Sequence, residues 1–228
     1  MCHLYANMAT ADSMRRHFLV EADNAVIGNA RPLPAIHPGY AAPVLRMSDN
    51  GRRELVEMNW GFLTPNYSKR DGSPIRPRTW NNARDDKLLS SELWRSSFHY
   101  RRCLIPATGY CETKGRKPAE FHWFGMQADN PDMRPLFALA GMWRMESEML
   151  HGSGESGLRH TMVTTNANEL ARPIHAKGRM PAIVSPDDYE TWLSGTVDRA
   201  LRLLKPFPSS EMRITLHGFD QREDPAFS

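Results

Sequence analysis

The sequence predicts a single α+β domain, spanning residues 1–228, in which antiparallel β-sheets are flanked by short helices. Three observations support this prediction. Short runs rich in β-branched and aromatic residues outnumber the segments with helical periodicity, so strands should form most of the core. The pair Asn50-Gly51 separates two of these runs and is a strong signal for a hairpin turn. No internal repeat and no linker-like stretch divides the chain, which favours one domain.

The first predicted helix covers Thr10 to Val20, with Thr10 or Asp12 as its N-cap. Its apolar face is expected to consist of Met14, Phe18 and Leu19. Residues 23–43 are rich in proline, glycine and alanine, and residues 64–79 are polar and contain prolines, so both segments are predicted to be loops.

Strands dominate the rest of the chain. They are predicted over Val44 to Met47, Glu54 to Phe62, Arg101 to Ile105, Glu120 to Met126, Leu136 to Trp143, His160 to Thr165 and Arg213 to Phe219. A short helix is expected over Glu92 to Phe98. Ser185 and Pro186 supply an N-cap and a first-turn proline for another helix, which should end at Gly195. Thr196 to Leu204 is expected to form a further helix.

Composition restricts the class of function. Hydrophobic residues make up 40% of the chain and charged residues 24%, as in soluble globular proteins. The net charge is only +3, so a nucleic-acid site must arise from local clusters of charge. No apolar run approaches the ~18 residues of a membrane helix. Three cysteines, with no signal segment before them, predict free thiols in a reducing cytoplasm.

Cys2 is the residue with the most specific chemistry. Removal of Met1 would leave an α-amine and a thiol on one residue, which is a 1,2-aminothiol. The amine condenses with an aldehyde to an imine, and the thiol then closes onto the imine carbon to form a thiazolidine ring. Ordinary pKa values of about 7.7–8.0 and about 8.5 leave both groups partly nucleophilic near neutral pH. Because Cys2 precedes the first predicted helix, little core packing is expected to depend on it.

Other clusters combine polar, charged or aromatic side chains. They are Asn82 with Arg84, Glu112 after an apolar strand, His175 with Lys177 and Arg179 in one loop, and Trp60 beside Phe62. Each cluster also has an ordinary structural explanation, as a turn, a solvated acid, an exposed loop or a core aromatic. As functional groups, the imidazole could transfer protons, the cations could hold phosphate and the aromatics could stack on bases.

The cysteines are not expected to bind metal. The spacing of Cys103 and Cys111 fits no common zinc pattern, and no second pair follows. No metal and no cofactor is predicted.

In this order along the chain, the clusters resemble the motifs of the SOS response-associated peptidase (SRAP) family of abasic-site processing proteins. The matching segments are Met1-Cys2, Trp60 to Pro65, Asn82 to Arg84, Arg102 to Glu112, Ala140 to Trp143, Thr164 to Pro181 and Glu223 to Pro225. The resemblance covers nearly the whole chain. It implies sheets with a barrel-like core, a positively charged groove for single-stranded DNA, and covalent capture of the aldehyde of an abasic site.

The resemblance also implies catalytic roles. Cys2 would be the nucleophile after the protein removes its own Met1, which would explain the word peptidase in the family's name. Asn82 would hold the N-terminal residue in place. Glu112 would move protons, and His175 would assist the opening of the abasic sugar.

For DNA binding, the resemblance implies phosphate contacts by Arg84 and by Lys177 or Arg179, and base stacking by Trp60. The chain departs from the family at its start, where an early arginine is absent, and in a longer interval between the histidine and the Met-Pro pair. The choice between Lys177 and Arg179 therefore stays open. The expected partner is single-stranded DNA with abasic sites, and the expected location is the cytoplasm, on the nucleoid when DNA is bound.

Two other classes of function remain. An N-terminal nucleophile amidotransferase also begins Met-Cys and uses an Asn-Gly element, which here would be Asn50-Gly51. The place of that pair between two strand-like runs favours an ordinary turn instead. A non-catalytic binder of single-stranded DNA or RNA would bind intact and abasic strands alike, without an adduct that survives denaturation.

Overall fold

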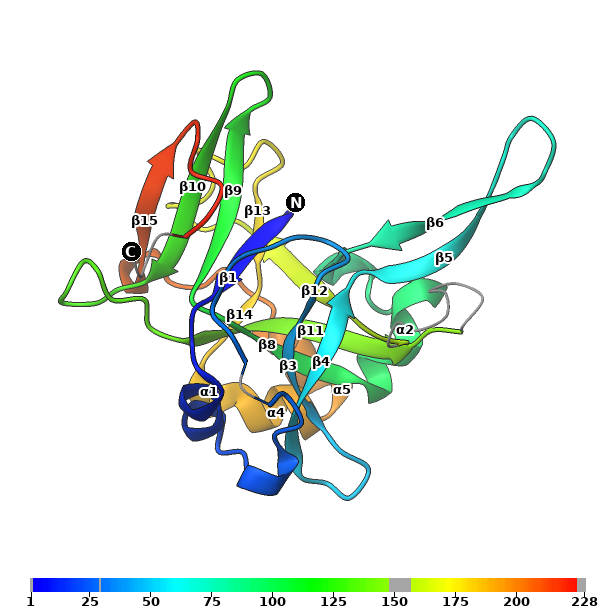
Figure 1. The fold of residues 1–228 in the computed structure, drawn as a ribbon, viewed down its shortest axis with the longest axis horizontal. Coiled ribbons are helices and arrows are strands. Elements are labelled where there is room, and N and C mark those ends of the chain that lie inside the picture. The colour runs from blue at the N-terminus through cyan, green and yellow to red at the C-terminus, as the bar shows by residue number, and fades with distance from the viewer. Residues whose placement is uncertain (1, 29, 148–156, 225–228) are drawn as a thin grey trace.

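The computed structural model describes residues 2–28, 30–147 and 157–224, so Met1 and Pro225 lie outside it. Within these residues the chain forms two larger sheets, a separate two-stranded hairpin and several short helices (Figure 1). The strands of the first sheet pair antiparallel throughout. In spatial order they are β15 (Met212–Gly218), β10 (Ala119–Met126), β9 (Gly109–Gly115), β1 (Leu4–Asn7) and β2 (Leu33–Ile36).

The second sheet closes on itself. Its strands, in spatial order, are β13 (Arg179–Pro181), β12 (Leu158–Asn166), β4 (Arg53–Trp60), β3 (Ala41–Met47), β8 (Arg102–Ala107), β11 (Phe137–Met145) and β14 (Ile183–Val184). The path from β12 through β4, β3 and β8 leads to β11, and β11 pairs with β12 again. These strands therefore form a closed, barrel-like core.

The barrel is antiparallel except at β12. This strand pairs in parallel with β4 and with β7 (Asn82–Arg84). Two parallel strands need a long connection between them. This condition is met, because β4 ends at Trp60 and β7 at Arg84, whereas β12 begins only at Leu158. The predicted class, antiparallel sheet with a barrel-like core and short flanking helices, is confirmed.

Short helices flank the barrel (Figure 1). They are α1 (Ala11–Phe18), α2 (Glu92–Tyr100), α4 (Tyr189–Ser194) and α5 (Val197–Leu203), with 3₁₀ turns η1 (Ala22–Asn24), η2 (Asp85–Lys87), η3 (Pro186–Asp188) and η4 (Ser209–Glu211). No helix among the described residues is long and apolar enough to cross a membrane.

Both ends of α1 are determined by identifiable capping residues. The Thr10 side chain accepts a hydrogen bond from the Ser13 amide, so Thr10 and not Asp12 is the N-cap. Met14 and Phe18 are fully buried as expected. Leu19 was expected on the same face, but it is the left-handed C-cap at φ 54° and is 77% exposed. The helix ends one residue too early to turn Leu19 toward the core.

Two segments predicted to be loops contain strands. Residues 23–43 include η1, β2 and the start of β3, and residues 64–79 include most of a hairpin between β5 (Phe62–Tyr67) and β6 (Pro74–Trp80). The hairpin projects from the body of the protein (Figure 1), and most of its side chains are exposed. With neither face covered, these strands have no alternation of apolar and polar residues, and prolines can lie on their free edges.

The two sheets meet around a cluster of aromatic side chains. Tyr5 of β1 contacts Trp60 of β4 edge to face, with ring centroids 5.0 Å apart. Tyr110 of β9 stacks on Phe124 of β10 at 5.0 Å, and all four rings belong to one buried cluster. Cys2 belongs to the same cluster and is fully buried. The expectation that little core packing depends on Cys2 is therefore wrong.

Candidate active site

Two adjacent amide side chains hold the Cys2 backbone. The Cys2 carbonyl accepts hydrogen bonds from Asn82 Nδ2 at 2.7 Å and from Asn81 Nδ2 at 3.0 Å. Asn82 is fixed by the parallel pairing of β7 with β12, where it lies opposite Met162. The Asn81 carbonyl accepts the indole N–H of Trp60 at 2.8 Å. The structure therefore brings Asn82 to Cys2 as expected, and it adds Asn81, which sequence reasoning missed.

The Cys2 thiol lies in a dry environment. Its Sγ donates to the Leu4 carbonyl at 3.2 Å and lies 3.7 Å from the Cys111 carbonyl. Burial, reinforced by the nearby negative charge of Glu112, raises the thiol pKa well above its usual range. The thiol is therefore neutral near pH 7 in this state, and its activation requires a partner that accepts its proton.

Glu112 and His175 form a buried acid–base pair next to Cys2. The Glu112 Oε2 and His175 Nε2 atoms are 3.6 Å apart, and the two residues are only 4% and 6% exposed. Burial raises the pKa of Glu112 to about 8 and lowers the pKa of His175 to about 4. Each group is thus driven toward its neutral form, so at neutral pH the carboxyl carries a proton that it can donate.

Backbone contacts fix the orientation of the His175 ring. Its Nδ1 accepts the backbone N–H of Arg179 at 3.0 Å and the backbone N–H of Lys177 at 3.2 Å. An atom that accepts hydrogen bonds carries no proton, so the neutral ring holds its proton on Nε2, the atom that faces Glu112. The loop between residues 175 and 179, which contains Gly178 at φ 58°, supplies these two donors.

The Glu112 carboxyl should make folding sensitive to pH. Its pKa is about 8 in the folded protein against an ordinary 4.5, so between these values the folded state keeps a proton that the unfolded state releases. Raising the pH through this window therefore destabilises the wild-type protein, by an amount on the order of a few kcal/mol. Glu112→Gln, which stays neutral, should lose this dependence and exceed the wild type in stability at pH 9. Urea unfolding at pH 5, 7 and 9 measures both proteins, and parallel curves would contradict the protonated carboxyl.

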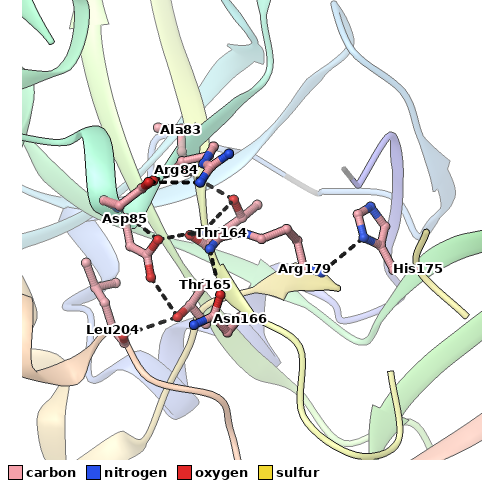
Figure 2. Close-up of polar contacts among 10 residues, drawn as sticks. Ala83, Arg84, Asp85, Thr164, Thr165, Asn166, His175, Arg179 and Leu204 are labelled. Carbon is pink, nitrogen blue, oxygen red and sulfur yellow. Dashed lines mark hydrogen bonds and ion pairs between the residues drawn. The ribbon is translucent and has the colours of Figure 1, made fainter. Parts of the chain in front are cut away.

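Arg179 is occupied by the protein itself. Its guanidinium donates to Asp85 Oδ1 at 2.7 Å, to Asn166 Oδ1 at 3.1 Å and to the Thr164 carbonyl. Figure 2 shows the side chain turned toward these groups. Arg179 is 8% exposed, whereas Lys177 is exposed to solvent. The expectation of a phosphate contact by Arg179 is corrected, because its donors tie β13 to β12 and η2, and Lys177 remains the predicted contact of the two.

We expect Arg179→Ala to destabilise the fold, because it leaves the partly buried Asp85 carboxylate without its cation. Loss of one partner from such a pair costs about 3 kcal/mol. Lys177→Ala, in the same loop, should change the free energy of unfolding by less than about 0.5 kcal/mol. Chemical denaturation of the two variants makes the comparison. Equal, small effects on stability would mean that the Arg179 contacts contribute nothing.

The other two predicted DNA contacts differ in accessibility. Trp60 is fully buried, its ring lies parallel to that of His160, and its N–H is bound to Asn81. Base stacking by Trp60 is therefore corrected to a role in the core. Arg84 has a side chain that is 55% exposed and forms an ion pair with Asp86 at 2.8 Å. Its role in binding phosphate stays a prediction.

A small cavity of about 130 Å³ is lined by residues of β1, β9 and β10 and by the residue that follows β2, and it reaches Glu112. Glu112, His3 and His37 are among the residues that line it. His3 Nδ1 also lies 3.2 Å from Asn81 Nδ2, so one amide contacts both of the first two described residues. Sequence reasoning missed His3 and His37 because nothing in their spacing relates them to residue 112.

The barrel and the site define a class of β-rich proteins in which an N-terminal cysteine is held by asparagine amides beside a buried glutamate–histidine pair. A model of the SOS response associated peptidase (SRAP) family matches residues 1–216. The chain belongs to this family, and the resemblance inferred from its motifs is confirmed.

Two relatives carry informative names. The chain is 27% identical over 184 residues to the abasic site processing protein YoqW of Bacillus subtilis (strain 168), with 77% of each chain covered. It is 26% identical over 208 residues to the abasic site processing protein HMCES of Gallus gallus, with 78% of this chain and 60% of that protein covered.

Solved structures support the fold. A protein from Bacteroides thetaiotaomicron superposes with a TM-score of 0.72 at 24% identity, covering 93% of this chain and 90% of the other. A protein from Bordetella bronchiseptica superposes with a TM-score of 0.70 at 23% identity, covering 95% and 98%. At this level of identity the comparison concerns the fold alone.

Proposed function

We propose that this protein processes abasic sites in single-stranded DNA by covalent capture of their aldehyde through Cys2. The observation that carries the proposal is the arrangement of Cys2, with its carbonyl held by Asn82 at 2.7 Å and its thiol close to the Glu112–His175 pair. Family membership and the names of the two relatives favour the same substrate.

The first step of the proposal frees the nucleophile. The ionised form of Glu112, which a pKa of about 8 makes available close to neutral pH, accepts a proton from a water molecule. The water oxygen attacks the Met1 carbonyl carbon, and Glu112 returns the proton to the Cys2 nitrogen as it leaves. One water is consumed, and free methionine and a Cys2 α-amine are formed. The two amides on the Cys2 carbonyl keep the residue in position while its N-terminal neighbour departs.

Capture then consumes the aldehyde and releases one water. The Cys2 amine adds to the aldehyde carbon, and the resulting carbinolamine loses its hydroxyl as water when Glu112 donates a proton. The thiol adds to the imine carbon, its proton goes to the imine nitrogen, and the thiazolidine ring closes. His175 Nε2–H lies on the Glu112 side of the ring, where it can donate to the sugar oxygen as the closed abasic sugar opens.

A single-stranded substrate suits this chemistry. An aldehyde at a missing base needs no extrusion of a base from a duplex. The exposed cations Arg84 and Lys177 lie near the site residues Asn82 and His175 in the sequence and can follow the phosphates without reading bases.

We expect Arg84→Ala to weaken binding to intact and abasic single strands by a similar factor. A phosphate contact carries no base information, and its loss should flatten the dependence of affinity on salt. Fluorescence anisotropy with both strands at several salt concentrations measures the effect, and Asp86→Asn serves as a control that keeps the guanidinium. A loss confined to abasic DNA would place Arg84 in the chemistry instead.

Intact mass of the purified full-length protein tests the proposal directly. Without DNA, the protein should lack Met1. With an abasic single-stranded oligonucleotide, a species should appear whose mass equals protein plus oligonucleotide minus one water. An intact oligonucleotide of the same sequence should give no such species. Equal affinity for both strands with no adduct would indicate a non-catalytic binder.

The amidotransferase alternative loses its structural basis. Asn50-Gly51 lies in the turn between β3 and β4, where Gly51 has φ 76° and Asn50 Oδ1 is bound to Ser48 Oγ. In Figure 1 this turn lies at the end of the molecule away from the N-terminus. Release of ammonia from glutamine would restore the alternative.

A further inference from the structure

Glu120, His122 and His217 gather on the paired strands β10 and β15, which lie side by side in Figure 1. His122 and His217 are direct cross-strand partners, and Glu120 lies two residues before His122, so all three side chains leave the same face of the sheet. One ligand atom from each residue lies within 4.8 Å of the other two. Sequence reasoning did not find this cluster, because about a hundred residues separate its two histidines.

The distances between the potential ligand atoms are close to those between the ligands of a bound metal ion. Glu120 Oε1 lies 3.3 Å from His217 Nδ1 and 3.7 Å from His122 Nε2. A tetrahedral zinc ion with bonds of about 2.0–2.1 Å separates its ligand atoms by roughly 3.3–3.5 Å. Two of the three ligand separations are thus within a few tenths of an ångström of those in a tetrahedral zinc site, and the third, between the two histidines, is at most 4.8 Å.

The orientation of His122 provides a second, independent argument. Its Nδ1 lies 3.4 Å from the backbone carbonyl of Glu120, which can only accept, so Nδ1 is the donor in this contact. Nε2, the other ring nitrogen, faces the Glu120 carboxylate at 3.7 Å, where it is placed to bind a metal ion together with that carboxylate. A ring N–H bound to a backbone carbonyl is also the usual way in which proteins orient a metal-binding histidine. His122 is 8% exposed, so packing holds this orientation.

We propose that Glu120, His122 and His217 form a binding site for a divalent transition metal ion, with zinc as the best match. Two imidazole nitrogens and one carboxylate oxygen are ligands that zinc prefers, and three protein ligands leave a fourth position open to water. The site lies on the catalytic face of the sheet, because His122 is also the cross-strand partner of Glu112 on β9. The ion would bridge β10 to the outermost strand of that sheet.

Metal titration of the full-length protein tests this proposal. The Cys2 aminothiol can itself bind zinc, so the titration uses Cys2→Ala protein, which keeps the three proposed ligands. Calorimetry with Zn²⁺ should give one site per chain. Co²⁺ should give tetrahedral d–d absorption without a thiolate charge-transfer band, which distinguishes these ligands from Cys103 or Cys111.

Variants in the same background identify the ligands. His217→Ala and Glu120→Gln change exposed or half-buried side chains and should leave the fold intact. Each should weaken zinc binding at least about 10-fold, since even outer-shell partners of a metal typically contribute 10–100-fold. His99→Ala, at an exposed histidine on α2, should bind as its parent does. Unchanged affinity in His217→Ala and Glu120→Gln, or no binding in the parent, would overturn the proposal.

Discussion

Cys2→Ala is expected to abolish the denaturation-resistant adduct with abasic single-stranded DNA. Without the thiol, capture stops at an imine, which hydrolyses when the protein is denatured. The change also removes a sulfur atom from the cluster around Tyr5 and Trp60, so the folded state should lose about 1 kcal/mol of stability. A denaturing gel and intact mass measure the adduct, and circular dichroism measures the fold.

Cys103→Ala is the matched control for this experiment. Cys103 is also a fully buried free thiol, but it packs in a different cluster with Val44, Val56 and Met58. Its replacement should cost a similar amount of stability and leave the adduct intact. If Cys2→Ala protein crosslinks as well as the wild type, the aminothiol mechanism is wrong.

Glu112→Gln is expected to slow adduct formation by about 10²–10⁴-fold, the usual contribution of a general acid or base. Glutamine keeps the size of the side chain but has no proton to exchange, and burial has adjusted the carboxyl pKa to about 8, close to the working pH. The defect should appear in protein whose Met1 has already been removed. A time course on a denaturing gel is sufficient to detect it.

Two further measurements separate proton transfer from positioning. Affinity for an intact single strand should barely change in Glu112→Gln protein, because the Glu112 side chain is almost completely buried. The wild-type rate of capture should also depend on pH around 8, and the variant should lose that dependence. Wild-type capture rates in processed Glu112→Gln protein would remove Glu112 from the mechanism.

The helices and strands that were predicted correctly are those with a clear pattern of apolar residues. α1 and α2 have an apolar face, and the longer barrel strands β3, β4, β8, β11 and β12 contain runs of apolar residues, so their bounds were predicted within a few residues. The short strands β13 and β14 were not predicted. β1 was missed because it is only four residues long, and two of the four, Ala6 and Asn7, are not typical of strands. β6 was missed because almost all of it is exposed.

Some residues of the candidate site were predicted from the sequence, but contacts between distant parts of the chain were not. Motif resemblance pointed to Asn82, Glu112 and His175, and the structure places them around Cys2. The motifs could not predict that Arg179 forms an ion pair with Asp85, because the two residues are far apart in the sequence. Nor could they show that Trp60 is needed to fill the space between two sheets, since the same residue type serves both stacking and packing.

The pairing of β1 with β9 has a consequence for the order in which the protein is made. Cys2 is synthesised long before its neighbours on β9 and the ring of His175. At 5–20 residues per second, roughly 170 residues of further translation take about 9 to 34 s. During that time the Glu112–His175 pair, which the proposed mechanism needs for the removal of Met1, does not yet exist. In the proposed mechanism, both the removal of Met1 and the reaction with an aldehyde must therefore wait until nearly all of the domain has been made.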